Sequence, residues 1–377
     1  MWLLQLLMYI MKSACKSTTK QHPLSDARIV IDKESPQVSC NKSSVIGALP
    51  RFDGPIESVT VKMVKKPHVY KVTVGNSLLY AKISCRPAFK WAAGSHGYAA
   101  LLAFLTWQFF DMGVPIPCTA SAIFTAQSFL KAGLDKRCVF VDHRFGGEVV
   151  AAAVFASIPG LQNHDEIVKQ WMLPYFTSRR SVGSKEKLNF ADVSALSILD
   201  YLFFNTDRAL PKNQYVWEGR PVAVDNGFFG SGHESICVQS KFDLTCPFVF
   251  RMTKKEGKFT DCFVNNSTIE FCMFSKDLAL RFLNFSSISF LSFMEKYYLQ
   301  SHLIDLLEHQ FDSGRIGNVQ VLLDRKIDQC PEALYSYSTP KEVFRNVVLI
   351  VIERILAVKD HMASCIQKSG QSYALQL

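Results

Sequence analysis

The stretch LDYLFFNTDRALPKNQYVWEGRPVAVDNG, from Leu199 to Gly227, decides how the rest of the chain is interpreted. It begins as an apolar, helix-like run and breaks at residues 205–208 (NTDR). It then passes Asn213 and returns through a short apolar run, residues 222–224, into residues 225–227 (DNG). A helix, a polar loop, a short strand and a second acidic turn are therefore expected in this order.

That order suits phosphoryl transfer from ATP. Asp207 on the loop can orient the proton of an attacking hydroxyl, while Asn213 and Asp225 can hold the Mg²⁺ or Mn²⁺ that neutralises the triphosphate. The competing interpretation is that these three residues only cap helices and form turns, which their residue types do well. Their order, spacing and flanking residues favour a kinase-like site.

Composition sets the limits of this hypothesis. The chain has 377 residues, of which 48% are hydrophobic, enough for one two-lobed domain or two ordinary ones. The net charge of +9 is spread along the chain, which favours solvated faces over an acidic partner. Aromatic residues lie in apolar runs rather than among basic residues, so no nucleic-acid partner is expected. No HExxH and no GxSxG motif occurs.

The first 55 residues are interpreted as a signal or anchor followed by a polar stem with little regular structure. Residues 1–11 (MWLLQLLMYIM) are apolar but too short to span a bilayer as a helix. They suit a signal-peptide core or a short anchor that associates with a membrane; the alternative is a buried or frayed helix. Sequons at four asparagines would accept glycans in a secreted chain: Asn41, Asn265, Asn266 and Asn284.

Eleven cysteines bear on the compartment. No Cys-x-x-Cys pair occurs, so a zinc ribbon or redox motif is not expected. Four cysteines fall between Cys237 and Cys272, in a polar, turn-rich segment. This density suits disulfides in an oxidising compartment, with buried free thiols as the alternative. The odd total leaves at least one cysteine unpaired within the chain.

Residues 57–84 alternate apolar and polar side chains on either side of Gly75-Asn76, which predicts a β-hairpin with a second strand ending near Lys82. A lysine inside an apolar strand has two interpretations. Taken alone, it is more often a solvent-facing residue of an edge strand. Its place just ahead of the next predicted helix favours a cleft position, where the ammonium holds the phosphates of ATP.

Helices are predicted over residues 97–112 and 192–204, and residues 178–187 (SRRSVGSKEK) are predicted to be an exposed loop. Further helices are predicted over residues 277–285, 292–311, 317–327 and 343–366. Strands concentrate early and helices late. The predicted fold class is α+β, with a sheet-rich N-lobe over residues 56–125 and a mainly helical C-lobe over residues 126–377.

The chain from Lys82 to Cys365 resembles the four-jointed and related secretory-pathway protein kinases, an atypical branch of the kinase fold. The residues that carry the resemblance are Lys82 in an early strand, a Gly97-led helix ending before Val114-Pro115, the Asn-Thr-Asp-Arg loop and the Asp-Asn-Gly turn. The central LDYLFFNTDR also resembles the type II phosphatidylinositol 4-kinases.

The resemblance implies a two-lobed atypical protein-kinase fold and transfer of the ATP γ-phosphate to a Ser or Thr hydroxyl of a secreted protein. It makes Asp207 the catalytic residue and gives nucleotide and metal binding to Lys82, Asn213 and Asp225. It implies residence in the Golgi or secretory-pathway lumen, or secretion, and leaves homo- or hetero-dimerisation open. In that branch a cysteine after the metal loop bridges one in the last helix, here Cys246 and Cys365.

The sequence departs from this family at the helix glutamate that pairs with the nucleotide lysine. Tyr98 stands there, and no glutamate occurs between Glu57 and Glu148. A kinase lysine without this partner loses orientation. Asn213 also lies one residue further from Asp207 than is usual in kinases. A catalytically silent pseudokinase that acts as a binding or allosteric partner is therefore one alternative, and a lipid kinase at the cytosolic face is another.

Overall fold

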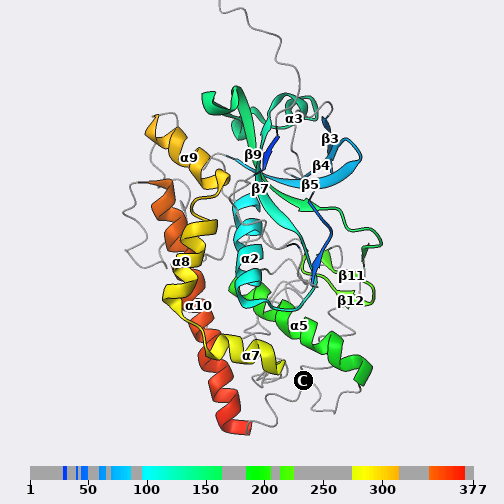
Figure 1. Ribbon diagram of the computed structural model, residues 1–377, viewed down its shortest axis with the longest axis vertical. Coiled ribbons are helices and arrows are strands. Elements are labelled where there is room, and N and C mark those ends of the chain that lie inside the picture. Colours follow the sequence, from blue (N-terminus) through cyan, green and yellow to red (C-terminus); the bar gives the residue numbers. More distant parts are fainter. Residues whose placement is uncertain are drawn as a thin grey trace, which may run out of the picture.

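The computed structural model describes residues 29–31, 40, 44–49, 59–64, 69–85, 96–163, 184–203, 205, 213–224, 274–313 and 339–369. The strands are β1 (Ile29–Ile31), β2 (Val45–Ile46), β3 (Val59–Met63), β4 (Val69–Val74), β5 (Ser77–Ser84), β6 (Ile116–Pro117), β7 (Thr119–Thr125), β8 (Phe140–Asp142), β9 (Gly147–Ala156), β10 (Gln162–Asn163), β11 (Tyr215–Trp217) and β12 (Arg220–Pro221). The helices are α2 (His96–Phe110), α3 (Gln127–Lys131), α5 (Ser184–Leu202), α7 (Lys276–Leu283), α8 (Ser287–Tyr297), α9 (His302–Asp312) and α10 (Pro340–Ser369), with 3₁₀ turns η1 (Lys136–Cys138) and η2 (His143–Phe145). The protein is a mixed α+β protein, with most strands before most helices, as the sequence predicts (Figure 1).

The main sheet has seven strands in the order β1-β7-β9-β5-β4-β3, with β8 paired to β9. Its neighbouring strands are antiparallel. One face of β5 and β9 packs under α3, and the other face is covered by α2. The sheet includes β8 and β9, so it extends past residue 125 into the segment assigned from sequence to the helical part.

The β4–β5 hairpin is confirmed, with Gly75 and Asn76 as its two turn residues. Gly75 has a φ of +55°, a left-handed conformation that a residue without Cβ adopts at little cost. The register pairs Val74 with Ser77 and Val69 with Lys82. Strand β5 continues two residues beyond Lys82, to Ser84.

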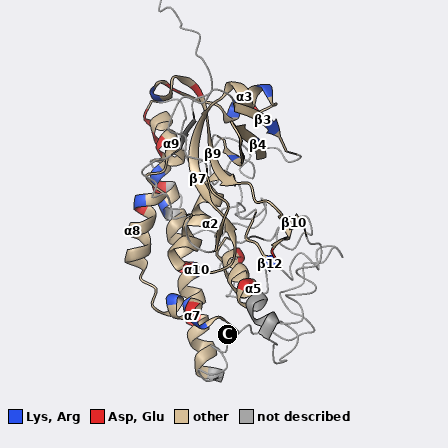
Figure 2. Cartoon of the chain, turned by 45° about the vertical axis from the view of Figure 1, so that its right-hand side comes forward, with Lys and Arg blue, Asp and Glu red and all other residues tan. Residues whose placement is uncertain are grey.

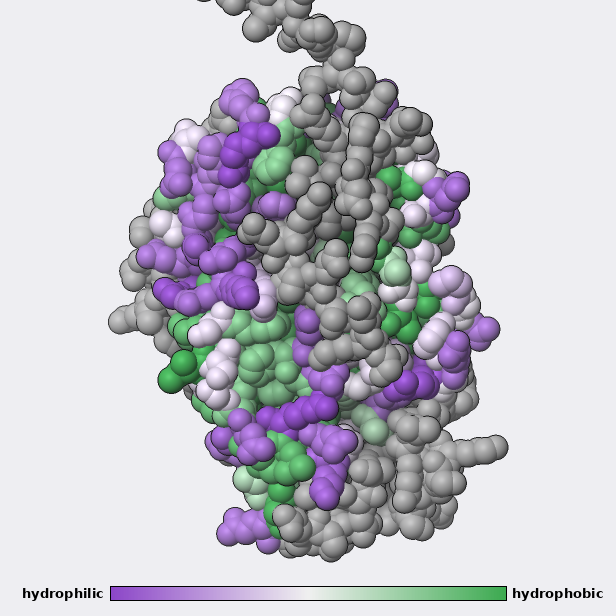
Figure 3. Space-filling view, viewed as in Figure 1, coloured by the Kyte–Doolittle hydropathy of each residue, from purple (hydrophilic) through white to green (hydrophobic). Residues whose placement is uncertain are grey.

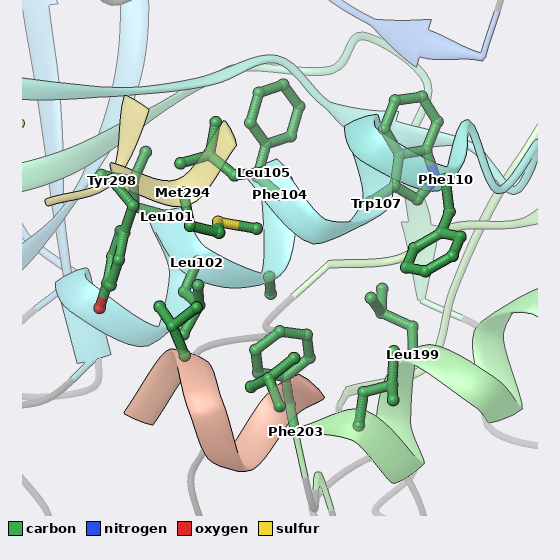
Figure 4. Packing of buried hydrophobic residues seen from close by; sticks show 14 of the residues in the cluster. Leu101, Leu102, Phe104, Leu105, Trp107, Phe110, Leu199, Phe203, Met294 and Tyr298 are labelled. Carbon is green, nitrogen blue, oxygen red and sulfur yellow. The ribbon is translucent and has the colours of Figure 1, made fainter. Parts of the chain in front are cut away.

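Helix α2 is the centre of the fold. Its sequence, HGYAALLAFLTWQFF, has no charged side chain, and it is buried along almost its whole length. It packs against β5, β7 and β9 on one side and against α7 and α8 on another. Figure 4 shows Phe203, just after α5, and Met294 of α8 among the α2 side chains that make this core. One hydrophobic core therefore joins the sheet to the helices.

Helix α10 runs for 30 residues along one side of the molecule and contacts α5, α7, α8 and α9 (Figure 1). Its buried residues recur every three or four positions, the spacing of one helix face. This series is Phe344, Val348, Val351, Ile355, Val358, Met362 and Cys365; Val347 and Ile352, beside it, are buried too. Among the helices of the described ranges, none combines the length and apolar character that crossing a membrane requires.

The described surface mixes charges of both signs. Figure 2 shows basic and acidic residues close together on α7 and around α9. In Figure 3, hydrophilic residues gather at the upper left and hydrophobic residues gather below them. The large hydrophobic side chains exposed in the described part are Met63, Leu280, Ile288, Leu349 and Leu356. Exposed apolar residues of this kind are normal on soluble proteins and carry no functional assignment by themselves.

The segment 12–55, expected to have little regular structure, contains the short strands β1 and β2, which pair with β7 and β6 respectively. Two predictions of helix bounds were wrong. Helix α5 begins at Ser184 rather than at residue 192, because Lys and Glu are good helix formers even without an apolar pattern. The helix predicted over residues 292–311 is two helices, α8 and α9. The helix predicted over residues 317–327 lies outside the described residues.

The break between α8 and α9 has a physical reason in its burial pattern. Tyr298, Leu299 and Ser301 are all buried, although they lie within four consecutive positions. A straight helix would direct neighbouring side chains to different faces. The chain turns instead, and the Ser301 amide donates a hydrogen bond to the Tyr298 carbonyl at 3.0 Å.

Two disulfides have both cysteines in the described part of the chain, and they join Cys40 to Cys118 and Cys85 to Cys138. Each links a residue near the sheet to a residue distant in the sequence. Such bonds persist in oxidising compartments, so they fit a protein of secretory type.

The predicted Cys246–Cys365 bridge stays a prediction. Cys365 is disulfide-bonded and fully buried on α10, whereas Cys246 lies outside the described residues. Of the four sequons, Asn284 lies in the described part, where it is exposed at the C-terminus of α7. Its position is therefore compatible with a glycan.

A charged cluster ties α9 to β8. The fully shielded Asp142 carboxylate accepts hydrogen bonds from Arg144, which also pairs with Asp305 of α9 at 2.8 Å. His309 Nε2 lies 3.9 Å from the same carboxylate, and the Gln310 amide donates to the Val141 carbonyl. Burial would raise the pKa of Asp142, but the hydrogen bonds and charge of Arg144 and the charge of His309 outweigh it, so the pKa is lowered.

This cluster predicts a specific acid sensitivity. A carboxyl whose folded pKa lies below its unfolded value stabilises the fold above the unfolded pKa, about 4, and that stabilisation is lost as the pH falls through the folded pKa. We expect Asp142→Asn to lower stability at pH 7 and to flatten the dependence of the unfolding midpoint on pH below about 4. Asp135→Asn, at a similar but exposed Asp-Arg pair, is the control. An unchanged acid profile for Asp142→Asn would contradict this role.

Candidate functional site

Lys82 lies in the interior of the main sheet. Its strand, β5, is flanked by β4 and β9, so the edge-strand interpretation of this lysine is wrong. Residues Leu79, Ala81 and Ile83 belong to the core on the α3 side of the sheet. Side chains alternate along a strand, so Lys82 projects from the opposite face, the one that α2 covers. It is 4% exposed, and lysines buried so deeply are almost always paired with another group.

Gly97 sets how closely α2 approaches this strand. A Cβ at residue 97 would collide with the Ser84 hydroxyl and would lie 2.8 Å from the Lys82 carbonyl oxygen. Only glycine allows this contact, because the second obstacle is backbone and cannot rotate away. The first turn of α2 therefore lies directly against the segment of β5 that carries Lys82.

Tyr98 occupies the position expected for the helix glutamate, and its side chain is buried in the helical core. Its ring packs on Phe344 of α10, with the ring centroids 4.7 Å apart. Burial raises the pKa of Tyr98 far above its usual value, an effect that the nearby Ser84 hydroxyl opposes. The Tyr98 and Ser84 hydroxyls nevertheless lack hydrogen-bond partners of good geometry in the described part. A phenol that stays neutral cannot replace a carboxylate as the ionic partner of a lysine.

Asp111, which directly follows α2, is also unsuited to that role. It forms an ion pair with Arg281 of α7 at 3.0 Å. It ties α2 to the helices and not to the Lys82 strand.

The loop expected to carry Asp207 begins from a firmly held helix end. After α5 the Asn205 amide donates to the Asp200 carbonyl at 2.7 Å, and the Asn205 side chain donates to the Asp200 carboxylate at 3.0 Å. Both residues are buried. Arg354 of α10 donates to the carbonyls of Tyr201 and Leu202, the last residues of α5. These contacts satisfy backbone acceptors that a helix end leaves open.

Asn213 is 2% exposed and lies just before β11. Strands β11 and β12 form a hairpin whose two turn residues, Glu218 and Gly219, both have positive φ, as a type I′ turn requires. After β12 the Ala223 amide donates to the Pro115 carbonyl at 2.8 Å, which ties this segment to the chain after α2. Val224 is the last described residue before Asp225.

A brace that the sequence did not reveal holds β12 in place. Arg220 donates two hydrogen bonds to the Asp192 carboxylate of α5, at 2.7 and 2.8 Å, and a third to the Gly113 carbonyl at 3.1 Å. Burial raises the pKa of Asp192, and the hydrogen bonds and charge of Arg220 partly offset the rise. The Arg220 guanidinium thus joins β12, α5 and the segment after α2, which are distant in the sequence. Local sequence patterns do not predict such a contact.

The structure therefore places two of the four predicted site residues. Lys82 is buried under α2, and Asn213 is buried at the start of the β11–β12 hairpin. Asp207 and Asp225 lie outside the described residues. Within the described ranges no group of three or more His, Cys, Asp or Glu residues could hold a metal ion.

The sequence was also compared with known families and with curated proteins. No family model matches the chain, and no curated protein is similar to it.

Proposed function

We propose that the protein is an ATP-dependent phosphotransferase of the secretory pathway, similar to Ser/Thr protein kinases, with a two-lobed kinase-like arrangement. The observation that carries the proposal is the buried Lys82, which lies in mid-sheet on the face covered by the next helix. A lysine on the third strand of a meander, followed by a helix on the same face, is the arrangement that holds nucleotide phosphates in kinases.

In this proposal each residue has a defined role. Lys82 binds the α- and β-phosphates, and Asp207 orients the acceptor hydroxyl of a secreted protein. Asn213 and Asp225 hold Mg²⁺ or Mn²⁺, which supplies the positive charge that neutralises the triphosphate. The chemistry of the two described residues fits these ligands. The ammonium of Lys82 suits phosphate, and the amide oxygen of Asn213 suits a hard cation such as Mg²⁺. The described disulfides support the Golgi or another luminal compartment over the cytosolic lipid-kinase alternative.

The second candidate is a pseudokinase, favoured by Tyr98. The kinase lysine is normally oriented by a helix carboxylate. Here that position holds a neutral, buried phenol packed on Phe344. A protein of this kind would keep the fold, and with it nucleotide binding, while lacking phosphate transfer.

A nucleotide-binding measurement tests both candidates. We expect ATP with Mn²⁺ to raise the thermal midpoint of the wild type, since a ligand at a hundred times its Kd adds about 2.7 kcal/mol of stability. Lys82→Met and Asp225→Asn are expected to abolish this shift. Lys131→Met, at an exposed lysine of α3 on the opposite side of the sheet, is the control and should leave the shift intact.

Transfer of labelled γ-phosphate to secreted proteins then separates the candidates. Transfer that is lost in Asp207→Asn supports the kinase, whereas an ATP shift without transfer supports the pseudokinase. The absence of any shift in the wild type would rule out both.

A further inference from the structure

The corner between α7 and α8 carries the sequon Asn284-Phe285-Ser286, which the proposed function does not use. Asn284 is the C-cap of α7, and Ser286 is the N-cap of α8. Phe285 is buried, and its ring packs near those of Phe110 and Phe290, with centroids 5.7 and 5.8 Å away. The middle residue of the sequon therefore anchors the corner in the core, while the two residues beside it are exposed.

The Asn284 side chain is free to carry a substituent. The Asn284 backbone amide donates to the Leu280 carbonyl at 3.0 Å, which completes the last turn of α7. Its carboxamide forms no hydrogen bond within the described part of the chain. Asn205 shows the opposite case, because its buried carboxamide donates to the Asp200 carboxylate. A bulky group on Asn284 therefore breaks no hydrogen bond of the described structure.

Two exposed apolar side chains flank this asparagine. Leu280, one turn earlier on α7, is 40% exposed, and Ile288, in the first turn of α8, is 79% exposed. Residues four apart on a helix lie on the same face, so Leu280 and Asn284 are neighbours. A single exposed leucine needs no explanation. Two exposed apolar side chains on either side of an unengaged sequon asparagine form a patch that a hydrophilic substituent there would cover.

We propose that Asn284 carries an N-linked glycan and that this glycan covers Leu280 and Ile288. Glycans on asparagine are bulky and solubilising, and they lie on protein surfaces. The inference rests on residence in the secretory pathway, which the disulfides fit, and not on phosphate transfer. The corner lies on the helical side of the molecule, away from β3 and β4 of the sheet (Figure 1).

The transfer step needs no oxidant or reductant. The donor is an oligosaccharide carried on a lipid diphosphate, which a transferase of the secretory pathway supplies. Asn284 Nδ2 forms a bond to C1 of the first sugar, and the bond between that carbon and the diphosphate oxygen breaks. The amide nitrogen releases one proton, and the lipid diphosphate leaves.

Occupancy is measured at Asn284 itself, on the full chain produced in the secretory pathway of a eukaryotic cell. A glycosidase that removes N-glycans converts the modified asparagine to aspartate, and heavy-oxygen water labels that aspartate for peptide mass spectrometry. We expect the label at Asn284 in the wild type and in Ser286→Thr, which keeps the sequon. Ser286→Asp should lose the label, although aspartate still caps α8.

The covering role is tested by self-association, measured by analytical ultracentrifugation. Asn284→Gln keeps an amide but cannot be glycosylated. We expect it to self-associate at a concentration about tenfold lower than the wild type, the effect of burying one isoleucine in a contact between copies. Adding Ile288→Ser should restore the wild-type behaviour. Adding Met63→Thr, at an exposed methionine of β3 away from the corner, is the control and should not restore it.

Thermal unfolding establishes that each variant is folded. Wild type and Ile288→Ser that are treated with the glycosidase after folding give the same comparison without a substitution at the sequon, and only the treated wild type should self-associate.

Each part of the proposal has its own contrary result. An unlabelled Asn284 in the wild type overturns the modification, whatever the ATP measurements show. Label at Asn284 together with equal self-association of Asn284→Gln and the wild type overturns the covering role. Restoration by Met63→Thr as well as by Ile288→Ser would indicate a general loss of solubility, which also overturns the covering role. A wild type that carries the glycan but binds no ATP overturns only the phosphotransferase proposal.

Discussion

Gly97→Ala is expected to destabilise the protein by about 3 kcal/mol, although alanine is the better helix former by about 1 kcal/mol. The methyl group would lie 2.8 Å from the Lys82 carbonyl oxygen and would also meet the Ser84 hydroxyl. Because the carbonyl belongs to a central strand, the helix must move instead, and its packed core moves with it. Denaturant unfolding measures the loss.

Two comparisons make this result interpretable. Ala100→Ser adds one atom to a half-buried position of the same helix and should change stability by less than about 1 kcal/mol. The double variant Ser84→Ala with Gly97→Ala removes the hydroxyl but not the backbone obstacle, so we expect only partial recovery. Wild-type stability in Gly97→Ala would show that α2 does not pack this closely on β5.

Arg220→Met is expected to cost about 3 kcal/mol and to weaken ATP·Mn²⁺ binding. Breaking a buried ion pair leaves an uncompensated charge, here on Asp192, whose side chain is 5% exposed. Arg220 is itself about one-third exposed, so we expect the lower end of the usual 3–5 kcal/mol range. Binding weakens because β12 leads to Asp225 and loses its anchor on α5.

The pH dependence of this variant follows from the raised pKa of Asp192. A carboxyl whose folded pKa lies above its unfolded value is penalised when ionised, and the penalty fades as the pH falls below the folded pKa. Loss of Arg220 raises that pKa further, so the gap between variant and wild type should narrow from pH 8 to pH 5. Asp192→Asn combined with Arg220→Met should recover stability. A gap that is constant with pH would mean that the cost arises from lost packing instead.

Local patterns in the sequence predicted local structure well. The alternation around Gly75-Asn76 gave the β4–β5 hairpin, and the apolar run before Gly113 gave α2 to within two residues at each end. The same alternation placed Lys82 on the second strand of this hairpin. That β5 is not an edge strand followed only from its pairing with β9 in the structure.

Contacts between distant segments were beyond such patterns. The brace of Arg220 on Asp192 joins residues 28 positions apart, and the Cys85–Cys138 bond joins residues 53 apart. The residues around these side chains do not indicate the pairing, because a charged side chain or a cysteine has the same sequence context whether it is solvated or paired. The role of Asp207 and Asp225 stays a prediction, since both lie outside the described residues.

The two disulfides have a joint topological consequence for α2. In sequence order their ends alternate, Cys40, Cys85, Cys118 and Cys138, so the two covalent rings overlap. The overlap, residues 85–118, contains the whole of α2. Each covalent ring by itself encloses the helix, so reduction of one disulfide would leave α2 inside the other ring.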